Sequence, residues 1–467
     1  MTFDDVIPAT LRVCEAHPGF DQLARACLVR DLQGQVRLVL EPRPDVAFTL
    51  DLPALAVALA AELGGYFARP LLCTQTGSAE ERRLAGAVLA QIAGRPERWP
   101  ASWPHEYVIP IAGTHRTKSG IWLGLARYLS KEVWLTSRDT APPWPKHART
   151  PPIVAFYSFK GGVGRSTLAG CVARRLVDEG QRVVLIDLDL EAPGAGTLFK
   201  VQTERGVIDF ILDHLATGNA TVDRCHAAAE ALGTLYAPSV DVVPAAASLD
   251  WRFLEKLARL DYAGWGPGAD EESPVAKAIR DLLIAVKDEL KPDTILIDSR
   301  SGLHDLGGLS LHALAHVDVL LARNSPQDLA GLRLALQALA RRKGGPENLD
   351  CVIVHSLAPL PPDQDPGKSE RAGFREAVYD LFREVVYREE DQDLPGVDVD
   401  TASHYPRVFP RFGDLDRLHT MADVPENVFE DAELGEIVAR IRDLYPSDEE
   451  GDEEPGAEAG GAPRPNA

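Results

Sequence analysis

A glycine-rich turn between an apolar run and a helical pattern constrains the fold of this chain more than any other feature. Residues 153–156 form a short apolar run that predicts a buried parallel strand. Residues 168–179 carry apolar side chains near helical spacing, and Gly180 follows them. Between the two stand Lys160, Gly161, Gly162, Val163, Gly164, Arg165, Ser166 and Thr167. Glycines allow backbone N–H groups to surround an anion, and a helix N-terminus adds partial positive charge, so the turn predicts a site for nucleotide phosphates.

The individual residues of this turn have separate expected roles. The backbone from Gly161 to Gly164, together with Arg165 and Thr167, is expected to contact the phosphates. Ser166 or Thr167 can offer a hydroxyl oxygen to Mg²⁺, and Ser166 is the preferred ligand. A dinucleotide-binding fingerprint does not fit, because no third glycine follows at the required offset. The predicted ligand is therefore a nucleoside triphosphate with Mg²⁺.

Aspartates follow two other apolar runs. Residues 182–187 end in Asp187, with Asp189 two positions later, and residues 293–298 end in Asp298. In an open parallel sheet, ligands bind at the carboxyl ends of the strands. We therefore expect all three carboxylates near the phosphates, with Asp298 holding Mg²⁺ through water opposite Ser166.

Strand and helix patterns alternate from residue 153 to about 445. This alternation predicts a mostly parallel, doubly wound α/β sheet with right-handed crossovers. Further strands are expected at 240–245, 317–322 and 349–354, and helices at 275–290, 329–341, 376–390 and 432–444.

The lysine ahead of the glycines, together with Arg165 in place of the usual lysine, resembles the deviant Walker A motif of ParA/MinD-like P-loop ATPases (SIMIBI class), in its KGGVGR variant. The resemblance covers about residues 153–444. It implies a Mg-ATP switch that dimerises face to face, in which Lys160 reaches the phosphates bound by the partner subunit. It also implies that Asp187 lies near the metal and that Asp189 orients the attacking water.

The same resemblance suggests how the base is recognised. The turn at Asn324 is similar to an Asn-Pro turn of the family, and residues 403–407 lie where the family places a loop over the base. His355 stands where relatives often have an asparagine that reads adenine. ATP, rather than GTP, thus follows from the resemblance alone.

The flanking regions are expected to be separate from this domain. Residues 1–137 predict a smaller α/β module of unknown role, with a hairpin at 27–40, helices at 52–63, 78–92 and 120–129, and strands at 71–73, 107–111 and 132–135. Five prolines between residues 141 and 152 indicate a semi-rigid linker at 138–152. Residues 446–467 are too poor in apolar residues to fold and are expected to be disordered.

Charge and composition exclude several classes of function. The net charge is −21, of which residues 446–467 contribute −6 through seven acidic residues and one arginine. Such a balance disfavours nucleic acid as a partner, and the acidic tail argues against membrane attachment by a basic helix. No apolar run reaches the roughly 18 residues of a membrane span, and the acidic N-terminus has no signal-peptide pattern. The six cysteines form no CxxC pair, so a cytoplasmic protein without a zinc site is expected.

The preferred interpretation is an ATPase switch that forms an ATP-dependent homodimer and signals to an unidentified protein partner through the N-terminal module. A nucleotide-binding scaffold with little or no hydrolysis is the first alternative, because the planar fork of Arg165 differs from the compact charge of a lysine. A bacterial P-loop tyrosine kinase is the second, although only Tyr445 lies near the C-terminus as a phosphoacceptor. DNA partitioning ranks behind both because of the charge.

Overall fold

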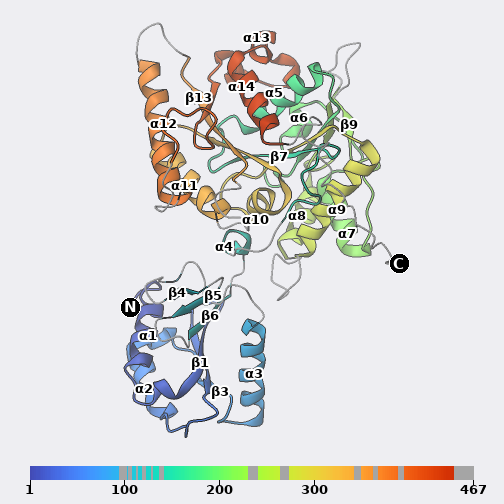
Figure 1. The fold of residues 1–467 in the computed structure, drawn as a ribbon. Coiled ribbons are helices and arrows are strands. Elements are labelled where there is room, and N and C mark those ends of the chain that lie inside the picture. Colours follow the sequence, from blue (N-terminus) through green and yellow to red (C-terminus); the bar gives the residue numbers. More distant parts are fainter. Residues whose placement is uncertain are drawn as a thin grey trace, which may run out of the picture. The chain divides into compact units, whose positions relative to one another are not determined.

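A computed structural model describes residues 1–93, 103, 108–111, 114–117, 122–127, 130–135, 141–229, 240–262, 273–340, 349–360, 366–387 and 394–445. The chain divides into two compact units, one that includes Met1–Ser137 and one that includes most residues from Arg138 onward (Figure 1). Within the described ranges, no helix combines the length and the apolar character that crossing a bilayer requires. The acidic tail at 446–467 lies outside the described residues.

The second unit is built on an eight-stranded sheet in the order β14-β13-β12-β7-β11-β8-β10-β9. Every neighbouring pair is parallel except β10 and β9. The strands are β7 (Ile153–Ser158), β8 (Val183–Asp187), β9 (Ala227–Ala228), β10 (Val240–Val243), β11 (Thr294–Asp298), β12 (Val317–Ala322), β13 (Cys351–Ala358) and β14 (Arg407–Pro410). The predicted mostly parallel α/β sheet is confirmed, while β9 and β14 were not predicted.

Helices cover both sides of this sheet (Figure 1). On one side lie α5 (Arg165–Asp178), α6 (Ala195–Leu198), α13 (Glu426–Phe429) and α14 (Ala432–Asp443). On the other lie α9 (Pro274–Leu290), α10 (Asp305–Leu309) and α11 (Pro326–Ala340). Next to these, α7 (Val207–Thr217) packs against α9 and α8 (Trp251–Tyr262), and α12 (Pro366–Val385) packs against α11 and β13. The central strands are therefore buried on both faces, which is why they read as continuous apolar runs.

The proline-rich segment before β7 packs on the second unit. Trp144 is buried there. Lys146 donates from Nζ to the carbonyl oxygen of Leu444 at 2.8 Å. The hydroxyl oxygens of Thr150 and Tyr445 lie 2.9 Å apart. The chain thus enters this unit beside the end of α14.

The first unit has a four-stranded sheet in the order β3-β2-β1-β6. Its strands are β1 (Leu23–Arg30), β2 (Val36–Pro42), β3 (Leu72–Cys73) and β6 (Trp122–Ala126), and β4 (Val108–Ile111) and β5 (Thr114–Thr117) form a separate antiparallel pair. Apolar residues of α1 (Val6–Glu15) and α2 (Leu52–Leu63) share one core with the sheet, and those of α3 (Ala79–Ala93) share another. The predicted hairpin is confirmed, and α3 begins with a capping box in which the amide of Ser78 donates to Glu81 at 2.7 Å.

Two predictions in the first unit are wrong. The helix expected at 120–129 contains strand β6 in its described part, and the strand expected at 132–135 is the short helix α4 (Glu132–Leu135). Trp122 contributes to the core under α1 and α2, whereas Leu123 contributes to the core under α3. A short run buried on both faces has no periodicity that separates strand from helix, and four residues are too few to show any.

Candidate functional site

The predicted phosphate loop lies between β7 and the N-terminus of α5. Gly162 and Gly164 have φ angles of +70° and +81°, a region that favours glycine. The end of the loop is fixed by the hydroxyl of Ser356 on β13, which donates to the carbonyl oxygen of Val163. Gly161 and Gly162 are exposed to solvent. The loop therefore leaves an accessible backbone at a helix N-terminus, the arrangement that binds phosphate groups.

A cavity of about 470 Å³ opens beside the first turn of α5. It is lined by Ser166, Thr167, Pro193, Gly194, Thr197, Leu198, Leu415, Leu418 and His419. Ser166 and Thr167 come from the predicted phosphate site, and the three leucines make part of the wall apolar. Sequence reasoning missed Leu415, Leu418 and His419, because they follow an unpredicted strand at no recognisable spacing from the loop.

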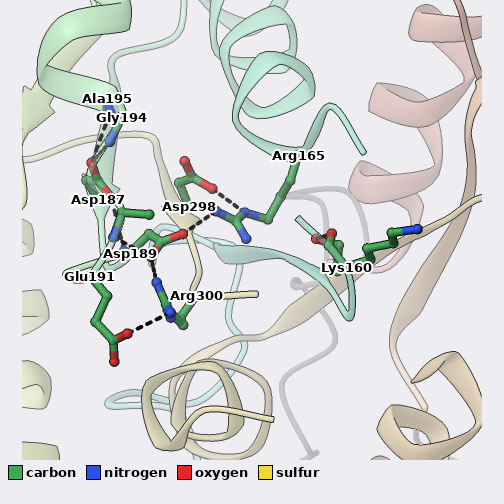
Figure 2. Close-up of polar contacts among 11 residues, drawn as sticks. Lys160, Arg165, Asp187, Asp189, Glu191, Gly194, Ala195, Asp298 and Arg300 are labelled. Atoms are coloured by element: carbon green, nitrogen blue, oxygen red, sulfur yellow. Dashed lines mark hydrogen bonds and ion pairs between the residues drawn. The ribbon is translucent and has the colours of Figure 1, made fainter. Parts of the chain in front are cut away.

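The side chain of Arg165 turns toward the strand ends rather than the open loop (Figure 2). Its Nε donates to Oδ1 of Asp298 at 2.6 Å, and its Nη2 donates to Oδ2 of Asp189 at 2.9 Å. Only 10% of the Arg165 side chain is exposed. Burial lowers the pKa of Arg165, but the carboxylates of Asp298 and Asp189 raise it by more. The pKa therefore lies above its usual value, and the guanidinium stays charged.

A second arginine continues this set of ion pairs. Arg300 follows β11 and donates to Oδ1 of Asp189 at 2.8 Å and to Glu191 at 2.7 Å. Nε2 of His304 lies 2.8 Å from the other carboxylate oxygen of Glu191. We call the whole series the charge chain: His304, Glu191, Arg300, Asp189, Arg165 and Asp298. Sequence reasoning gave Arg300 no role, although its position two residues after Asp298 was a usable signal.

Asp187 has a different environment from the other two aspartates. It is fully buried, and its Oδ1 accepts the amide of Asp189 at 3.0 Å. Its Oδ2 accepts the amides of Gly194 and Ala195 at 3.0 and 2.9 Å (Figure 2). Burial and, after it, the charge of Asp298 raise the pKa of Asp187 to about 7, although the three N–H groups oppose the shift. Asp187 therefore holds the loop after β8 in place.

The oxygen donors at this edge fit Mg²⁺ only in part. Mg²⁺ prefers hard oxygen ligands and is usually held by one or two carboxylates together with phosphate oxygens and water. The Ser166 hydroxyl and the Asp298 carboxylate meet this requirement and would hold the ion. Asp187 fits poorly as a ligand because both of its oxygens already accept hydrogen bonds. Among the described residues, no three His, Cys, Asp or Glu side chains form a metal-binding group by themselves.

Lys160 stands apart from the charge chain. It is exposed, and its side chain points away from Arg165 and the carboxylates (Figure 2). The two basic residues of the loop thus point in different directions, because Lys160 faces outward and Arg165 faces inward. An outward lysine is compatible with a contact to a second subunit, and that role stays a prediction.

Asn324 and His355, which were expected to bind the nucleotide, do not line this cavity. Asn324 is exposed and donates from its amide to the carbonyl oxygen of Glu370 at 3.3 Å. His355 is 1% exposed, and its ring stacks on Phe374 with centroids 4.2 Å apart. Burial, followed by the charge of Arg371, lowers the pKa of His355 to about 4. Their contacts with the nucleotide stay predictions.

The chain is similar to several known proteins. A family model described as ParA, NUBPL iron-transfer P-loop NTPase, matches residues 150–214. The carbon monoxide dehydrogenase accessory protein CooC of Rhodospirillum rubrum is 31% identical over 207 residues, which are 43% of this chain and 72% of that protein. An iron-sulfur cluster carrier protein of Aquifex aeolicus is 44% identical over 57 residues, 12% of this chain and 16% of that protein. The cell division ATPase MinD of Pyrococcus furiosus aligns with 63% of this chain and 100% of its own, at 19% identity and a TM-score of 0.39.

Proposed function

Because the chain belongs to the ParA/MinD-like family of P-loop ATPases, we propose that it is a switch that binds Mg-ATP and hydrolyses it slowly. The observation that carries this proposal is the exposed glycine loop at the start of α5, with Asp189 and Asp298 at the neighbouring strand ends. These groups supply the phosphate contacts, the metal ligand and the water-orienting carboxylate that nucleotide hydrolysis requires.

Each residue has a proposed task in the bound complex. The backbone of residues 161–164 and the side chain of Thr167 bind the phosphates, and Ser166 and Asp298 hold Mg²⁺. The ion, when bound, neutralises charge on the phosphate oxygens. Asp189 orients the attacking water, and Lys160 contacts the nucleotide of a second subunit. The resulting dimer would present the first unit to a protein partner.

A nucleotide-binding scaffold remains the second candidate, and one observation favours it. Arg165 is engaged with the same two carboxylates that hydrolysis needs, Asp189 and Asp298. Transport of an iron-sulfur cluster is not part of the proposal. Clusters are held by cysteine thiolates, and all six cysteines of this chain are buried and separated in sequence.

Isothermal titration with ATP and a non-hydrolysable analogue, with and without Mg²⁺, tests the proposed ligand. Phosphate release then separates the ATPase from the scaffold: binding with measurable turnover supports the switch, and binding without turnover supports the scaffold. Absence of binding refutes both.

Light scattering with the analogue tests the dimer. Lys160→Ala should bind nucleotide but stay monomeric, because the lysine acts on the partner subunit. Lys277→Ala, which removes an exposed lysine of α9, is the matched control and should dimerise normally. A Lys160→Ala protein that still dimerises would rule out the role across the interface.

A further inference from the structure

The guanidinium of Arg165 occupies the carboxylate oxygens that the proposed reaction needs. It holds Oδ1 of Asp298 and Oδ2 of Asp189 at once. While it does so, the proposed metal ligand Asp298 and the proposed water-orienting group Asp189 are both paired with Arg165. In this arrangement the negative charge of the two carboxylates is compensated in part from within the chain.

We propose that Arg165 has two positions. Without nucleotide it bridges Asp189 and Asp298, and with nucleotide it moves to the phosphates and releases both carboxylates. The proposal rests on the proposed function in one respect, that the glycine loop binds nucleotide phosphates. The proposal goes beyond that function because the two carboxylates become available to the metal ion and to the attacking water only when those phosphates are present.

The position of Arg165 in the chain makes this exchange feasible. It is the first residue of α5 and follows Gly164 directly, so its backbone borders the phosphate loop. Its long side chain turns inward from there to reach the strand ends. A guanidinium binds carboxylate and phosphate through the same two-pronged geometry, so the move replaces one set of charged hydrogen bonds by an equivalent set.

Electrostatics drives the exchange in one direction. A nucleoside triphosphate would bring several negative charges next to Asp189 and Asp298, and the repulsion at short range is strong in a buried site. Arg165 on the phosphates attracts the nucleotide, and a divalent cation can then compensate the released Asp298. Arginine and metal ion are thus alternative partners of one carboxylate.

Arg300 explains why Asp189 would stay in place after the release. It donates to Oδ1 of Asp189 at 2.8 Å, and the amide of Ala192 donates to the same oxygen at 3.2 Å. Arg165 holds only the other oxygen, Oδ2. Departure of Arg165 therefore frees one oxygen to accept a hydrogen bond while the carboxylate remains oriented. We assign Arg300 as the positioning residue of Asp189.

Binding of Mn²⁺ in the absence of nucleotide tests the first position of Arg165. Electron paramagnetic resonance should show weak binding to the parent protein and binding at least ~10-fold tighter to Arg165→Ala, within the usual range of coupling between two ligands. Asp298→Ala in the Arg165→Ala background should abolish the gain. Arg182→Ala, which breaks an exposed pair with Asp293, is the matched control and should show no gain.

Binding of ADP without metal tests the second position. Asp189→Asn weakens the hold on Arg165 and should tighten ADP by roughly 5-fold, because the guanidinium is released at lower cost. A purely structural arginine would leave ADP affinity unchanged, and that result overturns the proposal.

Circular dichroism checks the folding of each variant. If Arg165→Ala does not fold, Arg165→Lys takes its place, because a single ammonium cannot reproduce both contacts and should give a smaller Mn²⁺ gain. A folded Arg165 variant without any gain also overturns the proposal. Failure of the parent protein to bind ATP would instead refute the proposed function, whereas the Mn²⁺ measurement needs no nucleotide.

Discussion

Alanine in place of Gly331 on α11 should disturb the start of the phosphate loop. A Cβ at this position would lie 2.0 Å from Cγ and 2.3 Å from Cβ and Cδ1 of Phe159, which precedes Lys160 in the chain. These atoms are close to the backbone of Phe159, so a rotation of the ring cannot relieve the clash and the residue itself must move. Overpacking of this kind costs about 1–3 kcal/mol.

Gly435 on α14 provides the matched control for helix propensity. A Cβ there has Arg175 Nη2 at 3.8 Å as its nearest neighbour, which is ordinary contact. Both substitutions gain the ~1 kcal/mol that alanine has over glycine inside a helix, so this gain cancels in their difference. The free energy of unfolding of Gly331→Ala should therefore be about 1–3 kcal/mol below that of Gly435→Ala.

Scanning calorimetry and nucleotide titration together check this prediction. At roughly 2–4 °C per kcal/mol, the unfolding transition of the second unit should occur several degrees lower in Gly331→Ala than in Gly435→Ala. Affinity for ATP should fall in Gly331→Ala alone, because Phe159 is joined directly to the loop. Equal Tm values for the two variants would refute the reasoning, since Phe159 would then have moved without cost.

Three further predictions concern single residues of the site. Asp187→Asn replaces one of the two oxygens that accept buried N–H groups by an NH2 donor. It should lower the free energy of unfolding by about 1–3 kcal/mol in urea, with Mg-ATP affinity much less affected than by Asp298→Asn. Ser166→Ala should weaken Mg-ATP far more than metal-free ADP in calorimetric titration, because it removes a metal ligand only. The pKa of His355 is lowered to about 4, so the native state binds fewer protons than the unfolded state between pH 6.5 and 4. Stability should be lost as pH falls through that window, by up to about 3 kcal/mol, and urea titrations at several pH values should show a weaker loss in His355→Asn.

The sequence was most informative where one local element fixes the geometry. The turn at Gly162 and Gly164 could be predicted because its positive φ angles, the strand before it and the helix after it are all encoded within about 25 residues. The end of β11 was predictable for the same reason, because an apolar run closed by Asp298 places its carboxylate at the ligand-binding edge.

The interactions between distant segments could not be predicted in this way. The pairing of Arg165 with Asp298 joins residues that are 133 positions apart, whereas the glycine-rich turn indicated phosphate as the partner of the arginine. The burial of His355 depends on Phe374 of α12, a helix whose orientation no local pattern sets. Such contacts arise from tertiary packing, which single-sequence patterns do not contain.

The contact between the proline-rich segment and the end of α14 has a consequence for linked binding. Because Lys146 bonds to Leu444 and Thr150 lies against Tyr445, the two chain segments that leave the second unit start from the same place. One leads in sequence to the first unit and the other to the acidic residues 446–467. A partner that binds close to Lys146 would therefore also lie close to Leu444, so that binding at either segment can affect the other.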